Sequence, residues 1–166
     1  MTVFIHDASI LLDLIHAGLL ELFLVIPAGM ITTDFVVEEV TDTADRQKLE
    51  AVTAPGSLQI LASGVAELES ISALQNTHRA LSIADCSVLF HAIRLQAVVL
   101  TGDSRLRREA TQAGLDVHGT MWAFDELIGQ GLLAKSLAAK KLEHLLAMNP
   151  RLPREDCERR IHRWRK

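Results

Sequence analysis

The stretch "VVLTGDSRLRRE", residues 98–109, decides how the rest of the chain is interpreted. Its first four residues are apolar or β-branched, a composition typical of a buried strand. The residues after Asp103 have helical spacing, which ends at Gly114. In an open parallel sheet, ligands bind beyond the carboxyl ends of the strands, so Asp103 is a candidate functional residue.

Short strands alternate with helices along the whole chain. We expect strands over residues 2–6, 30–33, 58–61, 97–101 and 116–119. Helical spacing predicts helices over residues 10–17, 19–25, 35–40, 64–75, 83–96 and 104–113, followed by three more from about residue 120. Asp34 and Ser82 are the expected N-caps of two of these helices. The order predicts an α/β fold: a three-layer α/β/α sandwich with a central parallel sheet of four or five short strands, plus C-terminal helices.

Composition narrows the class of protein. The 166 residues are 49% hydrophobic, which is typical of a folded chain with a sizeable core. The two cysteines, Cys86 and Cys157, match no metal-site or redox spacing, so we expect a reducing, cytoplasmic environment. No basic, apolar leader opens the chain, and no stretch reaches the roughly 20 apolar residues that a membrane span needs.

The charge is unevenly distributed. Residues 1–150 carry 10 basic and 18 acidic residues, a balance of −8, whereas residues 151–166 carry 7 and 3, a balance of +4. We therefore expect a domain over residues 1–150 and a basic C-terminal tail or helix over residues 151–166. A solvated terminal helix and a contact with nucleic acid or an acidic partner both remain open for the tail.

Four acids from separate segments fall where a βα fold would bring them to one edge of the sheet. Asp7 and Asp103 follow strands, Asp85 lies in the first turn of a helix, and Glu38 or Glu39 lies early in another. Each alone has a structural explanation, as a helix cap, a dipole partner or a solvated charge. Together they would repel one another unless a cation neutralised them, and oxygen ligands of this kind favour Mg²⁺ or Mn²⁺. Such ions support phosphate chemistry.

Four motifs resemble the PIN-domain family of metal-dependent ribonucleases, many of which are toxins of the VapC type. They are "FIHDASILLDL", "ITTDFVVEEV", "LSIADCSVLFHA" and "VVLTGDSRLRREA", and the resemblance covers about residues 2–133. The last two are the most specific, because an acid opens an apolar helix and a strand then closes in Thr-Gly-Asp some 18 positions later. The resemblance implies hydrolysis of RNA phosphodiesters by a toxin with a small antitoxin partner, and by analogy a homodimer.

The resemblance also assigns the site. The family's four acids map to Asp7, Glu39, Asp85 and Asp103, with Glu38 as the alternative to Glu39. Asp7, Asp85 and Asp103 would hold Mg²⁺ or Mn²⁺, with Glu39 completing the set. Small hydroxyl residues that support these acids in the family match Ser9 and Thr101. Three arginines beside Asp103 are candidates for RNA contact or for solvated helix charges: Arg105, Arg107 and Arg108.

One departure keeps a second interpretation open. Many family members carry a further acid or amide shortly after the fourth acid, where this chain has Leu106, Arg107 and Arg108. That departure and the basic tail favour a scaffold that binds RNA or a protein partner without cleaving. An aspartyl phosphatase is disfavoured because Asp-x-Asp is absent after the first strand, where Asp7, Ala8 and Ser9 stand.

Overall fold

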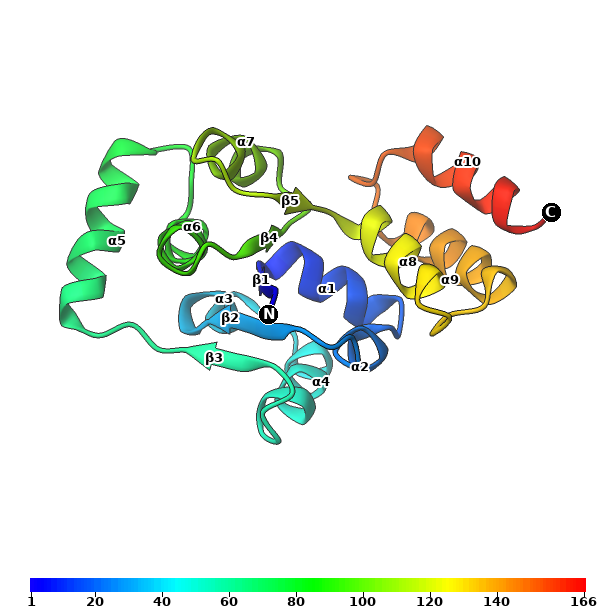
Figure 1. The fold of residues 1–166 in the computed structure, drawn as a ribbon, viewed down its shortest axis with the longest axis horizontal. Helices are drawn as coiled ribbons and strands as arrows, with labels where there is room; N and C mark the ends of the chain where they lie inside the picture. The colour runs from blue at the N-terminus through cyan, green and yellow to red at the C-terminus, as the bar shows by residue number, and fades with distance from the viewer.

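The computed structural model describes residues 1–166 as a five-stranded sheet with helices on both faces (Figure 1). All strands pair in parallel, in the order β3-β2-β1-β4-β5. Their bounds are β1 Val3–His6, β2 Gly29–Thr33, β3 Gln59–Leu61, β4 Val98–Leu100 and β5 Val117–His118. Because β1 lies at the centre and the chain leaves it for β2 and returns beside it with β4, the carboxyl end of β1 is the switch point of the sheet.

The chain forms ten helices. They are α1 Ala8–His16, α2 Leu20–Phe23, α3 Asp34–Glu39, α4 Thr43–Thr53, α5 Val65–Thr77, α6 Ile83–Leu95, α7 Ser104–Gln112, α8 Thr120–Gly129, α9 Lys135–Met148 and α10 Arg154–Trp164. Helix α6 packs against β1, β2 and β4, with α5 and α7 beside it, while α1, α2 and α8 lie on the opposite side of the sheet (Figure 1). The predicted three-layer α/β/α class is confirmed.

Side-chain alternation in β1 explains how both faces are filled. Phe4 packs against Trp122 and His6 against Phe23, so these two strand residues point toward α2 and α8. Ile5 between them is fully buried and points the other way. A strand buried on both faces reads as an apolar run, as the sequence of β1 does.

The cap of α3 differs from the prediction. We expected Asp34 as the N-cap, but the helix begins at Asp34, and the hydroxyl of Thr33 accepts the Val36 amide at 3.2 Å. Asp34 instead accepts the Ser63 amide at 3.0 Å and so ties the end of β3 to α3. Both residue types cap helices well, so the local sequence could not separate them.

The C-terminal segment is packed rather than solvated all round. Helix α10 buries Cys157, Ile161 and Trp164, and the Trp164 ring stacks on Phe124 with centroids 5.9 Å apart. The basic side chains occupy the other face of this amphipathic helix. None of the helices is long and apolar enough to cross a bilayer.

Candidate active site at the carboxyl edge of the sheet

Asp7 lies where β1 ends, and its carboxylate is held by the residues around it. The side chain caps α1 by accepting the Ile10 amide at 2.9 Å, and the Ser9 hydroxyl donates to both of its oxygens at 2.7 and 2.9 Å. The hydroxyl of Thr101 donates to Oδ2 from the end of β4. Asp7 is only 3% exposed, so this carboxylate has a fixed position at the switch point of the sheet.

Thr101 connects this carboxylate to the loop that carries Asp103. Its hydroxyl also accepts the Asp103 amide at 2.9 Å, and the Gly102 amide donates to the Ser9 hydroxyl at 2.8 Å. Asp103 in turn caps α7, because its Oδ1 accepts the amides of Arg105 and Leu106. Ser9 and Thr101 therefore lie where a supporting role requires them, between the first and the fourth acid.

Asp85 and Glu39 face each other across the start of α6. Ser82 and Asp85 form a reciprocal capping box, with the Ser82 amide 3.0 Å from Asp85 Oδ2. The Ser82 hydroxyl also lies 3.4 Å from Glu39 Oε1, which places the end of α3 beside the start of α6. The sequence predicts Ser82 only as a helix cap, and no pattern in it indicates the contact of Ser82 with Glu39.

The structure also separates Glu38 from Glu39. Glu38 is 78% exposed in its side chain and points toward Arg46 of α4, at 4.0 Å. Glu39, the next residue, points toward α6 and Asp85. Adjacent positions on a helix differ by about 100° in direction, so only Glu39 belongs to the group of acids at the sheet edge.

Electrostatics link these acids in pairs. Burial raises the pKa of Asp7 to about 6, against hydrogen bonds from Thr101, Ile10 and Ser9 that lower it, and repulsion by Asp85 adds to the rise. Burial first and Asp85 second raise the pKa of Glu39. Burial raises the pKa of Asp85 as well, and repulsion by Asp103 contributes. The four acids therefore lie close enough to destabilise one another's charged forms.

The oxygen ligands at this edge suit a divalent cation, but their present arrangement does not form a compact binding site. Three of the acids each keep one oxygen without a protein hydrogen-bond donor: Glu39 Oε2, Asp85 Oδ1 and Asp103 Oδ2. Carboxylate oxygens are the ligands that Mg²⁺ and Mn²⁺ prefer. As they stand, however, no three acidic, histidine or cysteine side chains form a ready-made ion-binding cluster. The donor type fits a hard divalent cation, and binding requires the side chains to move closer together.

The three arginines of α7 differ in what they contact. Arg105 and Arg108 have exposed side chains, at 62% and 59%, and lie beside Asp103 and Glu109. Arg107 turns inward, and its guanidinium donates to the backbone carbonyls of Thr101 and Val117 at 3.1 and 3.4 Å. Of the three, Arg105 and Arg108 are exposed to solvent beside an acidic neighbour, whereas Arg107 is bound to the backbone.

Comparison with known proteins shows which family this chain belongs to. A family model described as a PIN domain matches residues 3–166 and so includes the basic C-terminal helix. The crystal structure of PAE2754 from Pyrobaculum aerophilum is similar with a TM-score of 0.49 and 15% identity, over 65% of this chain and 86% of that one. No curated protein matches the chain in sequence. Because the family model spans nearly its whole length, the chain belongs to the PIN-domain family.

Proposed function

We propose that this chain is a metal-dependent endoribonuclease whose active site is the carboxyl edge around Asp7. PIN domains are generally nucleases, which supports the class of reaction. The observation that carries the proposal is the network through Thr101, which joins the buried Asp7 to the loop of Asp103 while Asp85 repels Asp7. Packing like charges together is costly, and a divalent cation would remove that cost.

In this proposal Asp7, Asp85 and Asp103 would hold one Mg²⁺ or Mn²⁺, and Asp85 and Asp103 each keep an oxygen without a hydrogen-bond donor that could serve as a ligand. Such an ion supplies charge stabilisation at the phosphate and an acidified water. Asp7 keeps a fixed direction because Ser9 and Thr101 donate to it. Glu39, which holds only a long contact to Ser82, has a free oxygen to accept a proton from the attacking water or to orient it.

RNA contact in this proposal falls to α7, where exposed positive charge adjoins the fourth acid. Arg105 lies 4.0 Å from Asp103 through its Nε and presents its other donors outward. Arg108, one turn further, pairs only with the neighbouring Glu109. Phosphate contacts of this type supply affinity without sequence preference. A role as a cytoplasmic toxin with a small antitoxin partner, and a homodimer, are further parts of the proposal that the family resemblance supports.

A second candidate function has its own observation. The absence of a ready-made cluster of three ion-binding side chains favours a scaffold that binds RNA or a protein partner without cleaving it. The missing acid after Asp103, at Leu106 to Arg108, points in the same direction. This candidate predicts RNA affinity that is independent of divalent ions.

One experiment separates the two candidates. Purified protein is incubated with single-stranded RNA in EDTA, in Mg²⁺ and in Mn²⁺, alongside Asp85→Asn. The nuclease predicts cleavage only with a divalent ion and loss of cleavage in the variant at an unchanged circular dichroism spectrum. RNA binding without cleavage in every buffer would support the scaffold and reject the nuclease.

A further inference from the structure

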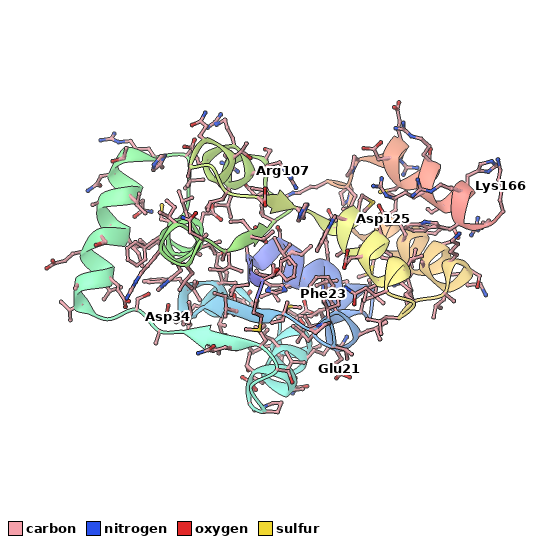
Figure 2. The ribbon with its side chains drawn as sticks, in the orientation of Figure 1. Glu21, Phe23, Asp34, Arg107, Asp125 and Lys166 are labelled. Carbon is pink, nitrogen blue, oxygen red and sulfur yellow. The ribbon has the colours of Figure 1, made fainter.

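Arg107 is placed unlike the other basic residues of α7. Its side chain extends from α7 toward β5 (Figure 2), and its two terminal nitrogens donate to carbonyls at the ends of two neighbouring strands. Nη2 lies 3.1 Å from the Thr101 carbonyl, just after β4, and Nη1 lies 3.4 Å from the Val117 carbonyl in β5. A planar guanidinium suits this bridging role, because it presents several donors in a fixed geometry.

The Thr101 carbonyl depends on this contact. Thr101 is fully buried, and no backbone amide donates to its carbonyl oxygen. A buried carbonyl without a donor is costly, so the guanidinium of Arg107 stabilises the backbone of Thr101 in its observed orientation. Thr101 is the residue whose hydroxyl donates to Asp7 and accepts the Asp103 amide.

Gly119, immediately before α8, leaves room for this contact. A Cβ atom at position 119 would lie 2.9 Å from Arg107 Nη2 and 3.3 Å from the Thr101 carbonyl oxygen. The backbone of Gly119 is in an ordinary extended conformation, so the position demands a glycine for space and not for its dihedral angles. A larger residue would displace the flexible end of Arg107 from Thr101.

We propose that Arg107 is a positioning residue, which holds the Thr101 carbonyl and through Thr101 fixes the Asp7 carboxylate and the Asp103 loop. The consequence for metal binding and cleavage rests on the proposed nuclease function. The consequence for the loop does not, because it follows from the contacts of Thr101 alone. The alternative role predicted from the sequence, direct contact of Arg107 with RNA, makes opposite predictions.

The variants are Arg107→Ala, Arg107→Lys, Gly119→Ala and the double variant Arg107→Ala/Gly119→Ala. Arg94→Ala on α6 is the matched control, since it removes one arginine from a side chain that is 59% exposed and paired only with Glu67, outside both the sheet edge and the basic tail. Hydrogen exchange of the Asp103 amide reports the Thr101 contact without any metal. Mn²⁺ affinity by titration calorimetry and RNA affinity in EDTA complete the set.

A positioning role predicts that Arg107→Ala speeds exchange of the Asp103 amide by roughly five- to tenfold, as expected for loss of one supporting hydrogen bond. Mn²⁺ affinity falls about 10- to 100-fold, the range for residues that orient metal ligands, while RNA affinity in EDTA is unchanged. Gly119→Ala gives the same changes and adds little to Arg107→Ala in the double variant. Arg107→Lys, able to reach one carbonyl, is intermediate, and Arg94→Ala behaves as wild type.

Two results would overturn the proposal. One is a loss of RNA affinity in Arg107→Ala with Asp103 exchange at the wild-type rate. The other is additive effects of the alanine substitutions at positions 107 and 119. If Arg107→Ala does not fold, Arg107→Lys and Gly119→Ala still test the positioning role, because both variants keep a cation at position 107. If the wild-type protein neither binds Mn²⁺ nor cleaves RNA, the proposed function fails, while Asp103 exchange still decides the role of Arg107.

Discussion

Two buried acids, Asp7 before α1 and Asp13 within it, have opposite surroundings. Asp13 is 5% exposed and accepts hydrogen bonds from Thr120 at 2.6 Å and Asn149 at 2.8 Å, and the titratable side chain near it is the imidazole of His16. Asp7 is equally buried and also hydrogen-bonded, but its charged neighbour is Asp85. The difference lies in the neighbouring group: Asp13 joins the C-terminal helices to the core, whereas Asp7 lies beside another acid, a like charge that the proposed divalent cation would offset.

The same contrast holds at the surface of these two regions. Near the C-terminus, Asp125 is paired with Arg160 at 2.9 Å and Arg163 at 3.4 Å, between α8 and α10 (Figure 2). At the carboxyl edge, Asp85 has no basic partner and Asp103 has only Arg105, at 4.0 Å. Asp125 is thus neutralised by two arginines of the chain, whereas Asp85 at the sheet edge has no such partner.

The largest effect is expected at the sheet edge. Asp7→Asn should reduce RNA cleavage in Mg²⁺ by at least about 10³-fold, because it removes a ligand charge from the proposed site. Gel assays of a labelled RNA measure this, and circular dichroism controls for folding. Cleavage within tenfold of wild type would remove Asp7 from the active site.

At the other acid, the expected loss is in stability. Asp13→Ala should lower the free energy of unfolding by about 2–4 kcal/mol, because Thr120 and Asn149 would lose their buried acceptor. Urea denaturation measures the change. Cleavage per folded molecule should stay at the wild-type rate, and a wild-type urea midpoint would contradict the account of Asp13.

Without metal, Asp7 should lower stability at neutral pH. Its pKa is raised from 3.8 to about 6 in the folded protein, so the folded state binds the proton more tightly. The free energy of unfolding therefore falls as pH rises from about 4 to about 6, and the loss is complete above that range, at up to about 3 kcal/mol.

The test is the difference in the free energy of unfolding between Asp7→Asn and wild type, because His6 titrates over a similar pH range. Burial lowers the pKa of His6 to about 4, so its contribution to stability rises with pH, and the difference between the two proteins cancels it. In EDTA, Asp7→Asn should be the more stable protein at pH 8 and the two should converge near pH 4. Mg²⁺ should stabilise wild type more than the variant. A variant that is less stable than wild type at pH 8 in EDTA would refute this prediction.

The smallest effect is expected at Asp125. Asp125→Asn removes a partly exposed partner of Arg160 and Arg163, so it should cost only about 0.5–1 kcal/mol. A thermal melt at low and high salt measures it, and the cost should shrink as salt screens the pairs. A loss of stability larger than that of Asp13→Ala would contradict the expected difference between a buried and a partly exposed acid.

Much of the fold was predictable from the sequence because local patterns determine it. The apolar runs that end in Asp7 and Thr101 mark the two central strands, and the capping box of Ser82 and Asp85 marks the start of α6. The packing of α10 also had a signal, since Cys157, Ile161 and Trp164 recur at helical spacing.

The side-chain positions at the candidate site could not be predicted, because they depend on contacts between segments that are distant along the chain. Glu38 lies 4.0 Å from Arg46 on α4 and Glu39 lies 3.4 Å from Ser82 at the start of α6, contacts that no local pattern reveals. The inward direction of Arg107 depends on the space left at Gly119. The positions of Asp7, Glu39, Asp85 and Asp103 in one active site remain a prediction, which rests on the resemblance and on their mutual repulsion.

The most direct test of the central claim is a crystal structure of the wild-type protein grown with Mn²⁺, with the ion located by its anomalous scattering. We expect a strong anomalous peak at the carboxyl ends of β1 and β4, with oxygens of Asp7, Asp85 and Asp103 within about 2.3 Å of it. No peak at this edge at saturating Mn²⁺, or a peak bound by other residues, would contradict it.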